Sequence, residues 1–181
     1  MPPSIKTRPQ RLRRLSLSVQ ALALLGGVAP LLLLPLFWSQ PDWVARVALG
    51  EWGLKAVQLD SGARLGGLLA TALPVGVSLW ALWQVWAMFG CYARGELLTP
   101  QPARHLRRLG WAMIMLAAAL PLGHSLIVLA LTWANPPGQR LLIFALSSQH
   151  YLSLLFGLML LALGTVLTEA ARLARENAEF I

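Results

Sequence analysis

Four apolar segments alternate with polar segments that carry all of the Asp, Glu, Lys and Arg residues. The apolar segments cover residues 17–38, 65–89, 110–133 and 151–167. Because an α-helix rises about 1.5 Å per residue, about 20 apolar residues cross the ~30 Å hydrocarbon core of a bilayer. The fourth segment is the shortest, but no helix breaker follows it, and we expect its helix to continue through residues 168–178. The pattern predicts four membrane-spanning helices.

The composition agrees with this prediction. Hydrophobic residues make up 57% of the chain, charged residues make up 12%, and the mean hydropathy is +0.62. These values lie outside the range of an ordinary soluble domain. The single cysteine, Cys91, excludes an internal disulfide and a cysteine-based metal cluster. We therefore expect an all-α integral membrane four-helix bundle over residues 17–181, preceded by a basic segment, residues 1–16.

Lys and Arg residues are divided unequally between the two sides of the predicted spans. One side carries Lys6, Arg8, Arg11, Arg13, Arg14, Arg94, Arg104, Arg107, Arg108, Arg172 and Arg175. The other side carries Arg46, Lys55, Arg64 and Arg140. Because basic residues are retained in the cytoplasm, both termini and the middle loop are predicted to be cytoplasmic. The net charge of +8 is then a topology signal, and nucleic-acid binding is disfavoured because the charges flank spans instead of covering one surface.

The N-terminal region also has the plan of a signal peptide, because a basic segment precedes an apolar run. The pair Arg13-Arg14 resembles part of a twin-arginine signal. No small-x-small cleavage site follows at residues 39–42, and the apolar run is long. We expect an uncleaved first span.

The first loop, residues 39–64, carries apolar side chains at helical spacing. Trp43, Val44, Val47 and Ala48 recur in this way. The spacing predicts a short amphipathic helix at the outer membrane interface, with Trp43 and Trp52 as anchors.

Small residues predict how the spans pack. Gly62 and Gly66 share one helix face, and Ser153, Gly157 and Gly164 share another. Small residues let helix backbones approach closely in a membrane. We expect these contacts within one chain, and contact between copies stays open as an alternative.

Three polar residues fall inside the predicted spans, and they form a candidate intramembrane polar site: Gln84, His124 and Ser125. Heme ligation in a bundle uses paired histidines at matched depth on different helices. His105 and His150 are predicted at opposite faces of the membrane, so we expect His124 to pack or to donate a hydrogen bond. No acidic residue lies in a span core, so the sequence predicts no metal site, no cofactor and no enzyme active site.

The cytoplasmic side carries the candidate interaction surface. Thr99 and Pro100 fit the N-cap and first position of a helix, on which three arginines then share a face. Beyond the fourth span, acidic and basic residues fit i,i+3 and i,i+4 pairs. We expect these two charged helical segments to face each other. The surface comprises Arg94, Glu96, Arg104, Arg107, Arg108, Glu169, Arg172 and Glu176.

Two interpretations of these charges stay open. In the first, they form a docking platform for a cytoplasmic protein or for anionic lipid headgroups. In the second, salt bridges hold the third span against the fourth, and the remaining charge only sets the topology.

Two segments on this side resemble an uncharacterised family of bacterial four-span inner-membrane proteins, known as a domain of unknown function. They are YARGELLTPQPARHLRRLGW, residues 92–111, and EAARLARENAEFI, residues 169–181. The similarity covers nearly the whole chain from about Gln20. Family members typically have an apolar aromatic residue in place of Leu98 and an acidic residue near Gln101.

The resemblance implies an inner-membrane location and the same topology, but no reaction. In some bacteria, genes of this kind occur beside small helix-turn-helix regulators, which implies by analogy a membrane partner that binds or sequesters a regulator. The sequence as a whole predicts a non-enzymatic interaction or regulatory component, multi-pass, in the bacterial inner membrane. Its expected partners are the lipid bilayer and either a cytoplasmic regulator or anionic headgroups. The alternative function is a small transporter or channel subunit.

Overall fold

Five helices make up the computed structural model over the residues that it describes, 7–54, 57–96, 99–136 and 138–179. In chain order they are α1 (Thr7–Ser39), α2 (Pro41–Gly50), α3 (Ser61–Ala93), α4 (Pro100–Thr132) and α5 (Ser148–Glu179). Four of them, α1, α3, α4 and α5, are long and apolar enough to cross a membrane. The all-α fold with four candidate spans is confirmed, and α5 continues without a break well past residue 167, as expected.

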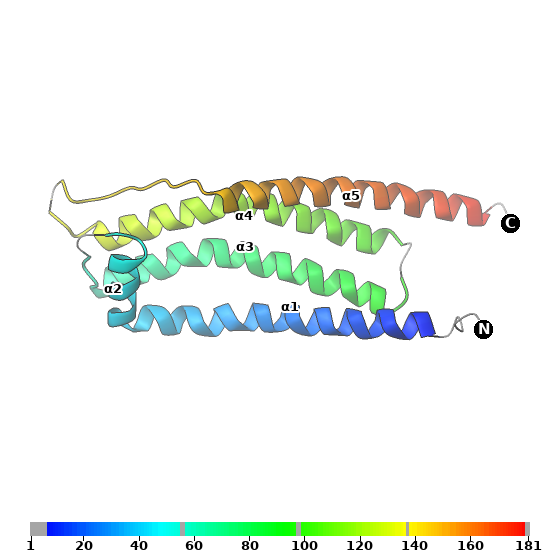
Figure 1. The fold of residues 1–181 in the computed structure, drawn as a ribbon, viewed down its shortest axis with the longest axis horizontal. Coiled ribbons are helices and arrows are strands. Elements are labelled where there is room, and N and C mark those ends of the chain that lie inside the picture. Colours follow the sequence, from blue (N-terminus) through cyan, green and yellow to red (C-terminus); the bar gives the residue numbers. More distant parts are fainter. Residues whose placement is uncertain (1–6, 55–56, 97–98, 137, 180–181) are drawn as a thin grey trace.

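The long helices lie side by side in chain order (Figure 1). The main contacts join α1 to α3, α3 to α4, and α4 to α5. The start of α1, the α3–α4 loop and the end of α5 lie at one end of the bundle, which we call the loop end. The opposite end, which we call the capped end, carries α2 and the segment that leads into α5. Since α1 and α5 are edge helices, their leucines are largely exposed, as expected for side chains that contact lipid.

The short helix α2 forms where the sequence predicts an amphipathic helix. Val44 and Ala48 are fully buried, whereas Trp43 is 45% exposed. The buried side packs in one cluster with Val128 and Leu131 near the end of α4. The amphipathic pattern of the first loop therefore covers the capped end of the bundle.

The small residues on α5 make close contact with α4 within the chain. A β-carbon added to Gly157 would lie 2.8 Å from the Gly110 carbonyl oxygen and 3.0 Å from the Ile114 amide nitrogen. The hydroxyl of Ser153 donates a hydrogen bond of 2.9 Å to the Met113 carbonyl. This stripe therefore packs two helices of one chain, as the sequence predicts.

Trp38 packs inside the bundle, although tryptophans at the ends of spans commonly lie at the membrane interface. Its side chain is only 3% exposed, and its indole occupies the space that a β-carbon on Gly67 would need. Trp111 and Trp133, by contrast, are 53% and 60% exposed. Among these three span-end tryptophans, Trp38 is a packing residue that joins α1 to α3.

Candidate docking surface

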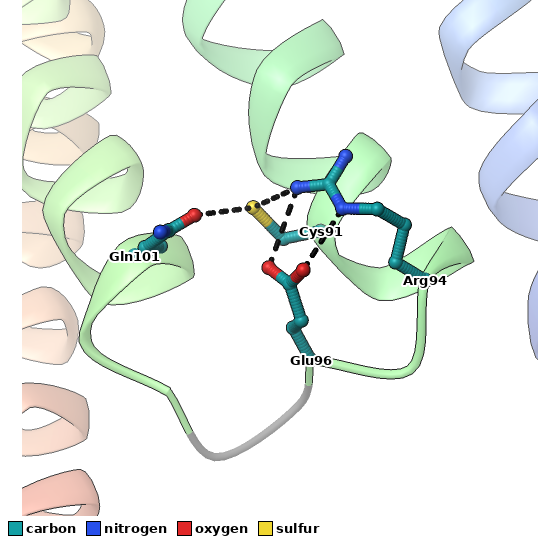
Figure 2. A network of polar contacts seen from close by, with 4 residues as sticks. All are labelled: Cys91, Arg94, Glu96 and Gln101. Atoms are coloured by element: carbon teal, nitrogen blue, oxygen red, sulfur yellow. Dashed lines mark hydrogen bonds and ion pairs between the residues drawn. The ribbon is translucent and has the colours of Figure 1, made fainter.

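The α3–α4 loop is closed by a network of four side chains (Figure 2). Arg94 donates from Nε to Glu96 Oε1 over 2.9 Å and from Nη2 to Glu96 Oε2 over 3.3 Å. The same Nη2 lies 3.3 Å from the sulfur of Cys91, whose thiol donates to Gln101 Oε1 over 3.8 Å. Gly95, with a φ of +84°, makes the turn that brings Arg94 and Glu96 together. The network ties the end of α3 to the start of α4.

Pairing between Arg94 and Glu96 in this loop shifts the pKa of both side chains. The hydrogen bond from Arg94 lowers the pKa of Glu96, and the hydrogen bond to Glu96 raises the pKa of Arg94. Both charged forms are therefore favoured over their neutral forms. These two residues of the predicted surface neutralise each other and do not act as free charges.

Three arginines on α4 form what we call the arginine face: Arg104, Arg107 and Arg108. All three side chains are exposed. Among the residues that the structure describes, the ion pairs involve other residues, and none includes these three. The arginine face therefore favours an anion.

The arginine face lines two hollows of about 230 Å³ each. The membrane-side hollow is lined by Arg104, Arg107, Arg108 and Trp111. The distal hollow, nearer the start of α4, is lined by Gln101, Arg104, His105 and Arg108. Because these residues recur at helical spacing, both hollows lie along one side of α4.

Three charged residues on α5, Glu169, Arg172 and Glu176, pair within their own helix. Arg172 Nε donates to Glu169 over 3.1 Å, and Arg172 Nη1 lies 3.5 Å from a carboxylate oxygen of Glu176. In the described part of the chain, no ion pair joins α4 to α5. The interpretation that salt bridges hold these two helices together therefore has no support among the described residues.

The expectation that the two charged segments face each other is wrong. Gly164 already lies against Ala103 and Arg107, only a few residues into α4. Residues of α5 from Glu169 onward therefore lie level with the start of α4 or beyond it, and Figure 1 shows α5 projecting past α4. The backbone contact at Gly110 and Gly157 sets this offset, and the sequence does not reveal it.

The three predicted intramembrane polar residues do not form one site. Gln84, only 2% exposed, has its Oε1 2.8 Å from Nδ1 of His105, and this places the shared proton on the histidine nitrogen. Ser125 donates towards the Pro121 and Ile143 carbonyl oxygens, which lie at 2.8 Å and 2.6 Å.

The third predicted intramembrane polar residue, His124, makes an edge-to-face contact with Trp52, with 6.0 Å between the ring centres. Its neighbour Gly123 lies against Pro74, ten residues before Gln84 on α3. Ten residues of helix correspond to about 15 Å. The two polar contacts therefore lie at different depths in the bundle.

His105 is the functional candidate that sequence reasoning missed. A glutamine in an apolar span needs a polar partner, because an unpaired amide in hydrocarbon is costly. The short loop between α3 and α4 places such a partner near the start of α4. The sequence shows that Gln84 needs a polar partner, but identifying His105 as that partner requires the register between the antiparallel helices α3 and α4. Within the described ranges, no three His, Cys, Asp or Glu side chains gather in a way that could hold a metal ion.

Comparison with known proteins gives a family but no function. No curated protein and no solved structure matches the chain. A family model described as a protein of unknown function matches residues 35–181, from the end of α1 through α5. The match includes the α3–α4 loop, the arginine face and both sequence segments that carry the resemblance. The chain therefore belongs to the DUF2975 family of proteins of unknown function.

Proposed function

We propose that this protein is a non-enzymatic component of the bacterial inner membrane that docks an acidic segment of a cytoplasmic protein at the distal hollow. The observation that carries the proposal is the exposed, unpaired arginine pair, Arg104 and Arg108, beside Gln101 and His105. Arginine donates to carboxylates in a planar, two-point geometry, and the neighbouring amide and imidazole add hydrogen-bonding groups. Complementary charge at such a site speeds association and selects the partner.

The excess of Lys and Arg at the loop end supports the cytoplasmic placement of this surface. The basic start of α1, the arginine face and the α5 arginines all lie at that end. Basic flanks are retained in the cytoplasm during insertion. The distal hollow is then accessible to a cytoplasmic partner, and both termini share that side.

Polar contacts inside the bundle favour docking over transport. A transporter would need one connected polar path, but Gln84 bonds to His105 while Ser125 bonds to backbone carbonyl groups about 15 Å away. Each of these groups has a partner within the chain. Their separation supports roles in helix packing, so the exposed arginines are the better candidates for function.

A site-specific crosslinking experiment tests the docking proposal. A photoreactive amino acid replaces Gln101 in the full-length protein, in native membranes, and crosslinked products are identified by mass spectrometry. We expect an adduct with an acidic cytoplasmic protein, lost in the Arg104→Gln variant and weakened by salt. Arg175→Gln is the matched control, because Arg175 is exposed at the same end but does not line the hollow.

Three outcomes contradict docking at this site. In the first, position 101 gives no protein adduct in correctly inserted protein. In the second, the adduct forms equally well in the Arg104→Gln and wild-type proteins. In the third, Arg175→Gln removes the adduct as completely as Arg104→Gln. That result would mean that the partner binds through the general positive charge of this end and not at the distal hollow.

A further inference from the structure

We infer that the membrane-side hollow is a binding site for an anionic phospholipid. The phosphate group would lie between Arg107 and Arg108, beside Trp111, and one acyl chain would follow α4 into the bilayer. The inference goes beyond the docking proposal. The two hollows share Arg104 and Arg108, but the lipid site also uses Arg107, Trp111 and the apolar face below them.

A single exposed stripe runs along α4, and its character changes along its length. The arginine face comes first, followed by Trp111 and then by apolar residues at three- and four-residue spacing. Those residues are Met115, Ala118, Leu122 and Leu126. Met115, Leu122 and Leu126 are 49%, 47% and 44% exposed, and Ala118 is also exposed. Residues on the flanking sides of α4 are buried against α3 and α5. The stripe therefore offers charge at one end and hydrocarbon contact along the rest, which matches the two parts of a phospholipid.

Depth along the helix places Arg107 and Arg108 at the level of lipid headgroups. A tryptophan that is 53% exposed at the end of a span prefers the membrane–water boundary. Arg107 and Arg108 precede Trp111 by four and three residues, which corresponds to about 5–6 Å along the axis. The headgroup layer on each side of a bilayer is roughly 5–7 Å thick. Arg104 precedes Trp111 by seven residues, about 10 Å, and so lies at or beyond the outer edge of that layer.

Arg107 is held in position by α5. A β-carbon on Gly164 would lie 2.6 Å from Cγ of Arg107 and 3.0 Å from its backbone nitrogen, so the stem of Arg107 packs directly on this glycine. A fixed stem leaves less freedom for the guanidinium group to lose on binding. The arginines around the hollow have no acidic partner among the described residues, so a phosphate oxygen would be their counter-charge.

A lipid fits this hollow better than an acidic protein segment. The apolar stripe that continues from it lies within a helix long and apolar enough to cross the membrane, where a soluble segment does not reach. An anionic lipid can pair its phosphate with the arginines and pack an acyl chain on the apolar stripe, whereas a free phosphate ion can pair only with the arginines. The bilayer also supplies such lipids at high local concentration.

Lipid binding to the full-length protein tests the inference. The protein is purified in a neutral detergent and titrated with phosphatidylglycerol or phosphatidylcholine, and the bound lipid is measured by native mass spectrometry. We expect selective binding of phosphatidylglycerol and a loss of about thirtyfold in Arg107→Gln/Arg108→Gln, since each basic residue near an anionic membrane contributes roughly fivefold. The double variant Arg107→Lys/Arg108→Lys should recover most of the affinity, which shows that loss in the Gln variant does not arise from misfolding.

One control tests whether the loss is specific to this hollow. Arg175→Gln should change phosphatidylglycerol binding by less than about twofold, because Arg175 is exposed at the same end of the bundle but does not line the hollow. Equal binding of the two lipids overturns the inference, and so does an unchanged affinity in Arg107→Gln/Arg108→Gln. Competition by inorganic phosphate at concentrations equal to the lipid would overturn the lipid assignment in favour of a simple anion site.

Discussion

The substitution Gly157→Ala tests the packing of α4 against α5 most directly. The new β-carbon would lie 2.8 Å from the Gly110 carbonyl oxygen, 3.0 Å from the Ile114 amide nitrogen and 2.7 Å from Ile114 Cγ1. Ordinary carbon contacts are about 3.5–4.0 Å. Two of these three neighbours are backbone atoms, so the helices must separate locally by several tenths of an ångström or more.

Overpacking of this kind costs about 1–3 kcal/mol. This cost is partly offset because alanine stabilises a helix by roughly 0.5–1 kcal/mol relative to glycine. The matched control is Gly76→Ala on α3, because a β-carbon at Gly76 meets nothing within 4 Å. Since both variants gain the same helix propensity, the difference between their free energies of unfolding isolates the contact. We expect Gly157→Ala to be less stable than Gly76→Ala by about 1–3 kcal/mol.

Unfolding in mixed detergent micelles, followed by tryptophan fluorescence, measures both free energies. Equal stabilities for the two variants would refute the close α4–α5 contact. Light scattering at two protein concentrations serves as the second readout. If Gly157 instead packs against another copy, Gly157→Ala should change the oligomeric state and leave the unfolding of the monomer unchanged.

Three further substitutions test other contacts. Gln84→Leu should destabilise the protein by about 1 kcal/mol because it leaves His105 unpaired, and Gln84→Leu/His105→Leu should recover part of that loss in the same unfolding assay. Because the pKa of Glu96 is lowered below its ordinary value of 4.5 by the hydrogen bond from Arg94, the stabilisation that this pairing provides is present above pH 4.5 and is lost as the pH falls through the folded-state pKa. The difference in Tm between wild type and Glu96→Gln should therefore shrink on acidification, and a difference that stays constant with pH contradicts the pairing. Asp60→Ala should cost about 1 kcal/mol because the Asp60 carboxylate caps α3, and Asp60→Asn should retain most of the stability.

Local sequence patterns were enough to predict the elements of this fold. The apolar runs gave the four candidate spans, and the spacing of Trp43, Val44, Val47 and Ala48 gave α2. Thr99 and Pro100 gave the start of α4, although the Thr99 hydroxyl makes no capping hydrogen bond. These features depend on neighbours within a few residues, so periodicity and capping preferences contain the information needed.

Relative placement of the helices could not be predicted in the same way. The small residues show which face of α5 packs against α4. The lengthwise offset between the two helices, which places Glu169 at or beyond the start of α4, depends on which residues of α4 each glycine of α5 contacts. Gly157 meets Gly110, and Gly164 meets Ala103 and Arg107. A shift of one turn would have changed the partners of every charge on α5. The pairing of Gln84 with His105 escaped prediction for the same reason, since it follows from the register between α3 and α4.

The two ends of the bundle differ in how α4 uses its polar groups, and this difference supports our placing the proposed sites at the loop end. At the capped end, α2 covers the core, and hydrogen bonds join the backbone of the segment before α5 to side chains of α4. Thr132 Oγ1 accepts from the Leu141 amide over 3.1 Å, and the Ser125 hydroxyl donates to the Ile143 carbonyl. These contacts use the polar groups of α4 that could otherwise bind a ligand there. At the loop end, Arg94 and Glu96 pair with each other, and Arg172 pairs on α5, which leaves the arginine face as the unpaired charge on α4. Because Arg104 and Arg107 lie about 5 Å apart in depth, one at the edge of the headgroup layer and the other within it, a single helix can present one arginine to a cytoplasmic protein and another to a lipid.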